Sequence, residues 1–257
     1  MTEPTTLDPE LRDFRKLIDE ANNIVFFTGA GISTDSGIPD FRSPGGIWSQ
    51  TQPVMFDDFV ASEDARRKAW QQKLESHRDM SVAEPNRGHL AIAHLNSIGK
   101  SPWLITQNID GLHEKAGFPA EQIIELHGNG TYAKCLDCGK HHKLEPILQA
   151  FEADGTLPDC DACGGIVKTA TISFGQSMPV AAMQQAEVAT RECDLFVAVG
   201  SSLQVYPAAG FPVFAKQQGA RLVILNRDPT DLDEHADLVL NREIGPALAA
   251  AVGFNLQ

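Results

Sequence analysis

The chain has 257 residues, 42% of them are apolar, and its formal charge is −13. This length allows one large domain or a large domain with a smaller one, and the apolar content excludes a disordered protein. The acidic balance disfavours phosphate backbones, so we expect no nucleic-acid partner, and it favours basic protein segments. The first ten residues show no signal-peptide pattern and no apolar run approaches about 18 residues, so we expect no membrane contact and a cytoplasmic location.

Strand-like and helix-like segments alternate along most of the chain. An amphipathic helix is predicted over 7–23, where apolar residues recur at helical spacing, and the apolar run 24–27 suits a strand buried on both faces. This alternation predicts an α/β fold with a mostly parallel sheet covered on both faces. The further strands are expected at 103–106, 123–126, 170–174, 195–199, 221–225 and 237–240, and helices at 88–97, 178–191 and 206–218.

Two stretches interrupt this rhythm. Residues 48–86 are polar and helix-like without a strand signal, and residues 132–168 contain cysteine and glycine with few large apolar residues. Because neither stretch continues the strand–helix alternation, we interpret both as insertions carried by the core.

A glycine turn, Gly29-Ala30-Gly31-Ile32-Ser33, follows the first predicted strand. Glycines at such a turn let backbone N–H groups approach a pyrophosphate. The dehydrogenase fingerprint is incomplete, because Thr34 occupies its sixth position and the next acidic residues, Asp35 and Asp40, come too early for the ribose-binding acid expected about 20 residues further on. An ordinary glycine-rich turn remains the alternative.

The loop that follows contains Asp40, Phe41 and Arg42. Gly37 and Pro39 prevent a helix from continuing here. Arg42 is suited to pair with a phosphate, and Phe41 is suited to shield a reactive sugar from water. A solvent loop with an incidental arginine is the alternative.

Polar residues recur where predicted strands end. Gln107, Asn108 and Asp110 follow the strand 103–106, and His127 follows the strand 123–126. Ligands of open α/β sheets bind outside the carboxyl ends of the strands, and a histidine there is suited to general-base work. Turn formation is the alternative for each segment, but recurrence favours one ligand site along this edge. The later strand ends carry Gly200, Ser201, Ser202 and Asn226.

Four of the five cysteines form two pairs, Cys135-x-x-Cys138 and Cys160-x-x-Cys163. This spacing is typical of a zinc ribbon, in which two CxxC turns complete a tetrahedral Zn²⁺ site. Four thiolates leave no open position for a substrate, so the predicted site is structural. Two disulfides or a redox-active pair are the alternatives.

In this order and spacing, the motifs resemble those of the sirtuins over about residues 10–245. The resemblance implies a Rossmann-like NAD-binding domain made of 1–47, 87–131 and 169–257. It also implies a small domain made of the helical insertion 48–86 and the zinc ribbon 132–168, with an acyl-lysine peptide between the two domains. The expected cofactors are NAD, as a co-substrate, and a structural Zn²⁺.

The implied activity is NAD-dependent deacylation of protein lysines, most simply deacetylation, with nicotinamide, free lysine and O-acyl-ADP-ribose as products. His127 is the implied catalytic base, acting on the ribose hydroxyls. The acyl-lysine tunnel would contain Ile109, Ile172, Phe174 and Gly175. The implied NAD-binding residues are Gly29, Ala30, Gly31, Ser33, Asp40, Phe41, Arg42, Gln107, Asn108, Asp110, Gly200, Ser201, Ser202 and Asn226.

The chain departs from the family pattern at several positions. Gln176 stands where glutamate is usual, Thr169 where proline is usual, and Ser201 where threonine is usual. The first two lie near the strand expected to pair with the peptide, so they bear on peptide preference. The helical insertion has Trp70-Gln71-Gln72-Lys73 in place of the Tyr-x-x-Arg pair of succinyl-preferring members, which favours neutral acyl groups. A mono-ADP-ribosyltransferase and a non-catalytic, NAD-sensing interaction module remain alternatives.

Overall fold

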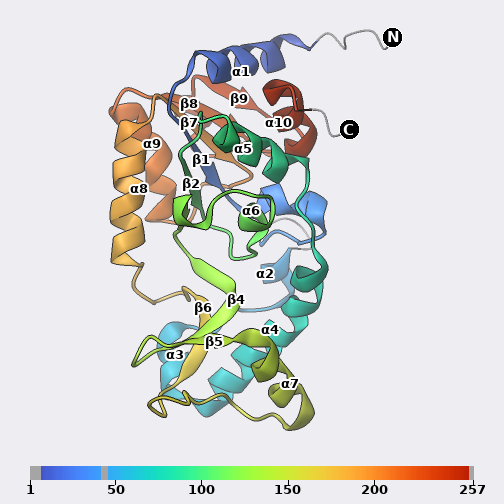
Figure 1. Cartoon of the computed structure of the whole chain (residues 1–257), viewed down its shortest axis with the longest axis vertical. Coiled ribbons are helices and arrows are strands. Elements are labelled where there is room, and N and C mark those ends of the chain that lie inside the picture. The colour runs from blue at the N-terminus through green and yellow to red at the C-terminus, as the bar shows by residue number, and fades with distance from the viewer. Residues whose placement is uncertain (1–6, 42–45, 255–257) are drawn as a thin grey trace.

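A six-stranded parallel sheet forms the larger part of the molecule (Figure 1). The computed structural model describes residues 7–41 and 46–254. The strands are arranged in the order β3-β2-β1-β7-β8-β9. This is the order of a Rossmann fold, whose two halves diverge between the two central strands, here β1 and β7. Their bounds are β1 Ile24–Thr28, β2 Trp103–Thr106, β3 Ile123–Glu125, β7 Leu195–Val199, β8 Arg221–Leu225 and β9 Leu238–Leu240.

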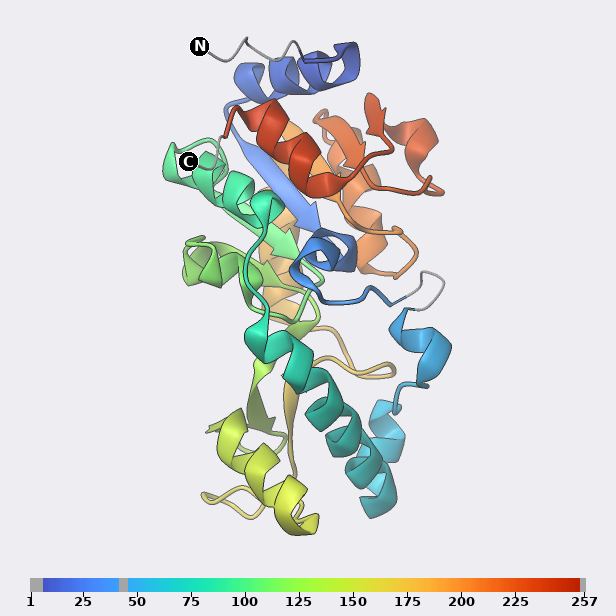
Figure 2. The same cartoon turned by 90° about the vertical axis from the view of Figure 1, so that its right-hand side faces the viewer.

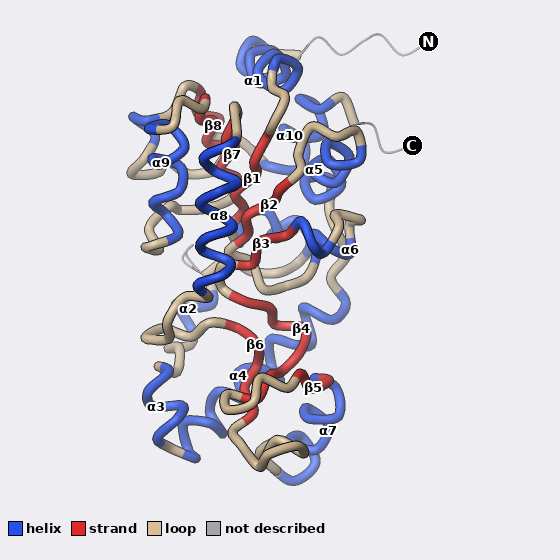
Figure 3. Tube along the Cα trace, turned by 60° about the vertical axis from the view of Figure 1, so that its left-hand side comes forward, coloured by secondary structure: helices blue, strands red, loops and turns tan. Residues whose placement is uncertain are grey.

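Helices cover both faces of this sheet (Figure 3). Side chains alternate across β1, so Phe26 packs in a cluster with α1, α5 and α10, whereas Phe27 packs in a cluster with α8 and α9. Both phenylalanines are fully buried, which explains why the run 24–27 is apolar at every position. The helix bounds are α1 Pro9–Glu20, α5 Arg87–Ser97, α8 Val180–Glu192, α9 Phe211–Gln217 and α10 Ile244–Val252.

A second, antiparallel sheet in the order β5-β4-β6 lies at the other end of the molecule (Figure 2). Four helices accompany it, and Trp70 of α4 packs there with Leu148 and Phe151 of α7 in a separate apolar cluster. The elements are α2 Ile47–Gln50, α3 Phe56–Ala61, α4 Glu63–Val82, β4 Gly128–Cys135, β5 His141–Lys143, α7 Leu144–Asp154 and β6 Val167–Thr171.

Short helices complete the connections. They are the 3-10 helices η1 Ala30–Ser36, η2 Ala120–Gln122, η3 Ala208–Gly210 and η4 Asp233–His235, and the α-helix α6 Leu112–Lys115. Among the residues that the structure describes, no helix is both long and apolar enough to cross a membrane.

The α/β fold and its mostly parallel sheet are confirmed, but the strand expected at 170–174 is wrong. The strand there, β6, ends at Thr171 and pairs antiparallel with β4 in the second sheet, and residues 172–174 follow it outside any strand. Residues 170–173 are only half-buried and Phe174 is exposed, and the local pattern could not indicate the partner strand. The helix α7 within 132–168 was also not expected, although Leu144, Leu148 and Phe151 lie on its buried side.

Candidate functional site

The carboxyl ends of β1 and β7 meet through backbone contacts between two glycine turns. The N–H of Gly29 donates to the carbonyl of Val199 at 3.0 Å, and the N–H of Gly31 donates to the carbonyl of Gly200 at 2.8 Å. A Cβ atom on Gly31 would lie 2.8 Å from Cα of Gly200, so a side chain does not fit there. This point is where the sheet reverses its winding, and such points bind nucleotides in open α/β sheets.

Three predicted residues converge beneath this turn. The Ser33 hydroxyl donates to Oδ2 of Asp110 at 2.7 Å, and the amide of Asn108 donates to the Gly29 carbonyl at 3.1 Å and to Ser33 Oγ at 3.3 Å. Oδ1 of Asp110 accepts from the N–H of Leu112 at 2.9 Å. Burial raises the pKa of Asp110. The arrangement gathers fixed acceptors and donors of the kind that orient a carboxamide.

His89 supports this network from the start of α5. The N–H of Asn86 donates to Nδ1 of His89 at 3.3 Å, so the ring proton is on Nε2, which faces Ser33 Oγ at 3.5 Å. Burial lowers the pKa of His89 to about 4, which keeps the ring neutral. The neutral ring and the Asn86 cap fix the direction in which the Ser33 hydroxyl donates.

A second buried group lies under the strand ends. The hydroxyl of Thr28 lies 2.8 Å from that of Thr106 and 2.9 Å from Nε2 of His113, and the rings of His113 and His89 lie 4.8 Å apart. Burial lowers the pKa of His113 well below its usual range. Two buried, neutral histidines, His89 and His113, therefore pack next to the predicted ligand-binding residues.

Sequence reasoning did not select His89, His113 or Asn86. The available signal was an asparagine three residues before a histidine at a predicted helix start, which is a capping pattern. Neither histidine follows a strand directly, so only the packing of α5 and α6 on the sheet brings them to the site.

His127 lies beside Gln107, from the neighbouring strand end. Its Nδ1 is 3.1 Å from the backbone carbonyl of Gln107, and the Gln107 side chain donates to Ser201 Oγ at 2.8 Å. Burial lowers the pKa of His127. The site thus links the ends of β1, β2, β3 and β7, as the recurrence of polar strand ends predicted.

The four residues predicted for the acyl-lysine tunnel lie on two segments near His127. The N–H of Ile172 donates to the His127 carbonyl at 2.8 Å, and the Ile109 carbonyl accepts from Gly130 at 2.7 Å. Phe174 and Gly175 are exposed on the loop after β6. Ile172 and Phe174 therefore extend from β6 rather than from a core strand.

The remaining predicted residues lie on segments next to this network or after β8. Asn226 follows β8 and its side-chain amide donates to the Asp228 carbonyl at 2.7 Å. Ala30 begins η1, Ser202 is half-buried beside Ser201, and Asp40 and Phe41 are on the loop after η1. Arg42 lies outside the described residues.

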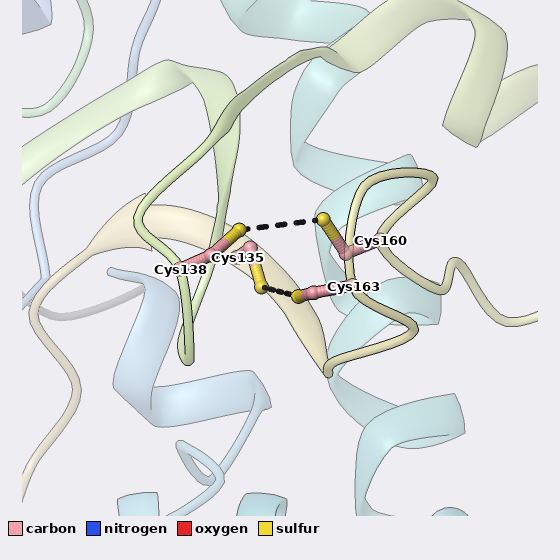
Figure 4. Close-up of side chains that lie close together, drawn as sticks. All are labelled: Cys135, Cys138, Cys160 and Cys163. Carbon is pink, nitrogen blue, oxygen red and sulfur yellow. Dashed lines mark hydrogen bonds between the residues drawn. The ribbon is translucent and has the colours of Figure 1, made fainter.

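The four paired cysteines come together beside the second sheet, where β4 ends at Cys135 (Figure 4). Sγ of Cys135 lies 3.6 Å from Sγ of Cys163, and Sγ of Cys138 lies 3.6 Å from Sγ of Cys160. Four thiolates about 2.3 Å from one Zn²⁺ lie about 3.8 Å apart in a tetrahedron, so the cluster fits the ion.

Comparisons with known proteins agree with this geometry. The model of the Sir2 family matches residues 29–207. An NAD-dependent protein deacetylase of Rhodopseudomonas palustris is 55% identical over 237 residues, covering 92% of this chain and 94% of that protein. An NAD-dependent protein deacetylase of Thermodesulfovibrio yellowstonii is 41% identical over 233 residues, covering 91% and 90%.

Solved structures give the same result. A Sir2 structure with a p53 peptide and NAD+ has a TM-score of 0.85 and 34% identity, covering 95% of this chain and 99% of that chain. A Sir2 variant with a deacetylated p53 peptide and 3′-O-acetyl ADP ribose has a TM-score of 0.87 and 33% identity, covering 95% and 98%. The chain belongs to the Sir2 family.

Proposed function

We propose that this chain is an NAD-dependent protein lysine deacylase that acts on acetyl-lysine and releases nicotinamide, free lysine and O-acyl-ADP-ribose. The observation that carries the proposal is the placement of His127. Its ring is held by the Gln107 carbonyl at the strand edge that also presents Asn108 and Asp110. The relatives bear the name NAD-dependent protein deacetylase, and a Sir2 structure holds NAD+ with a peptide.

His127 acts as the base in this proposal. A carbonyl only accepts hydrogen bonds, so Nδ1 carries the proton and Nε2 keeps a free lone pair. Because burial lowers its pKa, the ring is neutral near pH 7 and can take a proton from a ribose hydroxyl. NAD supplies the ADP-ribosyl group that accepts the acyl oxygen as nicotinamide leaves.

The other residues bind and orient. Asn108, Asp110 and Ser33 would hold the nicotinamide carboxamide, because they form a fixed network in the inner part of the site. Phe41 would exclude water from the reacting sugar, and Arg42 would pair with phosphate. The turns that contain Gly29, Gly31 and Gly200 would lie against the diphosphate at the start of η1, and their glycines allow the two turns to pack closely.

The residues around the second sheet have structural and substrate roles in this proposal. Zn²⁺ would hold the two CxxC turns together, and Ile109, Ile172, Phe174 and Gly175 would contact the acyl-lysine. The domains would follow the two sheets, and the peptide would lie between them. Five free thiols, four of them grouped for a metal, support a reducing location such as the cytoplasm.

The test is a panel of acetyl-, propionyl-, butyryl- and succinyl-lysine peptides incubated with NAD and analysed by mass. We expect deacylation of the acetyl peptide with formation of O-acetyl-ADP-ribose, and slower reaction of the succinyl peptide. Transfer of ADP-ribose to protein without loss of the acyl group would contradict the proposal.

His127→Ala is expected to lower kcat by about 100-fold or more, as removal of a general base does. His235→Ala is the matched control, because the ring of His235 in η4 is exposed. A normal rate for His127→Ala would refute the assigned base.

A further inference from the structure

Lys168 of β6 places an ammonium group in the interior of the second sheet. The residue is only 4% exposed, and within the described ranges 7–41 and 46–254 no carboxylate lies within 4.0 Å of its Nζ. Burial lowers its pKa to about 8. Burying an ammonium group costs free energy, and an apolar side chain of the same length would fill this space without that cost. The hydrogen bonds that Nζ donates therefore indicate the role of the buried charge.

Nζ of Lys168 binds its own strand. It donates to the carbonyl of Thr171 at 2.6 Å and, more weakly, to that of Thr169 at 3.4 Å. The ladder between β4 and β6 is irregular here, because Ala133 pairs with Thr169 whereas Gly128 pairs with Thr171. Five positions of β4 thus correspond to two of β6, and such a bulge interrupts the ladder hydrogen bonds. The ammonium group of Lys168 supplies a hydrogen-bond donor to β6 where the ladder is interrupted.

The hydrogen bond from Lys168 to Thr171 lies next to the segment that contains the proposed catalytic base, His127. Thr171 precedes Ile172, whose N–H donates to the His127 carbonyl at 2.8 Å. The two segments approach closely, since a Cβ atom on Gly128 would lie 2.1 Å from the Ala170 carbonyl oxygen. The backbone conformation at Thr171 therefore determines the direction in which residues 172–174 continue beyond β6, and so their position beside His127.

The helix α3 of the helical insertion contacts both Lys168 and the segment that follows β6. The Lys168 ammonium lies 6.0 Å from the centre of the Phe59 ring in α3. The N–H of Phe56, at the start of α3, donates to the Phe174 carbonyl at 2.9 Å. Lys168 thus touches both the strand that leads to residues 172–174 and the helix that holds their far end.

We propose that Lys168 is a positioning residue for the acyl-lysine peptide: its ammonium holds residues 171–174 in the course that places the peptide against His127. The inference rests on the proposed deacylase function for its substrate. Lys168 contacts none of the described residues assigned to NAD, so its removal is expected to affect peptide binding and to leave NAD binding intact.

The test compares Lys168→Met with Lys134→Met. Lys134 is the partner of Lys168 in the ladder and is exposed, so it receives the same chemical change without the buried contact. For Lys168→Met we expect the KM for an acetylated peptide to rise about tenfold, as loss of a charge-assisted hydrogen bond does, with the KM for NAD changed less than about twofold. Lys134→Met should keep both constants.

Two further measurements do not depend on turnover. Hydrogen exchange at the Ile172 amide should accelerate in Lys168→Met, and affinity for a fluorescent acetylated peptide should fall to the same extent as KM rises. Zinc content should stay at that of the wild type. Should Lys168→Met fail to fold, Lys168→Gln keeps a neutral donor and should give a smaller change in the same direction.

Unchanged peptide affinity and unchanged Ile172 exchange in a folded variant would overturn the inference. An equal loss of peptide and NAD binding would overturn it too, because that result indicates general destabilisation. If the wild type binds the acetylated peptide but does not deacylate it, the proposed function fails while the binding and exchange measurements still decide the role of Lys168.

Discussion

Nδ1 of His127 lies 3.1 Å from the backbone carbonyl oxygen of Gln107. This single contact fixes the tautomer of the neutral ring, because the carbonyl cannot donate. It also joins the ends of β2 and β3, so the orientation of the proposed base depends on the register of two core strands.

The rate should depend on pH through His127. The neutral ring is the active form, and burial lowers its pKa from the ordinary value of 6.5, so activity is lost only when the pH falls below that lowered pKa. We expect the acid limb of kcat/KM for an acetylated peptide to be centred below pH 6.5. An acid limb centred above that value would show that another group titrates.

Removal of zinc should destabilise the second sheet. Cys163→Ser removes one of four thiolates, and two of the others, Cys135 and Cys160, belong to the buried apolar cluster of Trp70, so loss of the metal would disturb that cluster too. We expect loss of the bound zinc and a fall of the melting temperature, measured with metal analysis and calorimetry. Cys193→Ala, a buried thiol outside the cluster, should retain one zinc per chain. Retention of the wild-type melting temperature by zinc-free protein would contradict the structural role.

Gly200→Ala should destabilise the protein and weaken NAD binding. Gly200 has φ of +63°, and a Cβ atom there would lie 2.4 Å from the backbone nitrogen of Ile32. Overpacking and an unfavourable φ together cost roughly 2–4 kcal/mol in the free energy of unfolding. Gly99→Ala is the control, because φ is +79° with no atom within 4 Å, and it should cost about 1 kcal/mol. Equal losses in urea denaturation would show that the contact with η1 is unimportant.

Gln176→Glu should leave peptide binding almost unchanged. Oε1 of Gln176 accepts from the N–H of Ser173 at 3.1 Å and so closes the turn that contains Phe174 and Gly175. A carboxylate oxygen can accept the same bond, so the KM for an acetylated peptide should change less than about threefold. Gln176→Leu removes the acceptor and should raise this KM more than Gln176→Glu does. A larger rise of this KM in Gln176→Glu than in Gln176→Leu would mean that a negative charge at position 176 weakens peptide binding directly.

Local patterns identified most of the elements. The strands 24–27, 103–106 and 195–199 were predicted within one residue of β1, β2 and β7, because unbroken apolar runs between polar ends are characteristic of parallel strands. The segment 170–174 instead alternates apolar and polar residues, and its strand belongs to the antiparallel sheet. Periodicity reports burial, whereas the partner of a strand is chosen by contacts far apart in sequence.

For the site, the sequence by itself determined which chemical groups are present. The spacing of Cys135, Cys138, Cys160 and Cys163 defined a metal cluster, because ligand number and geometry are encoded within each short turn. Strand-end polarity placed Gln107, Asn108, Asp110 and His127 at one edge, because parallel strands end together.

Only the tertiary structure decided how these groups act. The contact of His113 with Thr28, the contact of His127 with Gln107 and the burial of Lys168 all join segments from different elements or depend on their packing. Tautomer, pKa and hydrogen-bond direction follow from the solvent and the partners around a group. Those surroundings exist only when the chain is folded, so the sequence names the residues and the fold sets their protonation and orientation.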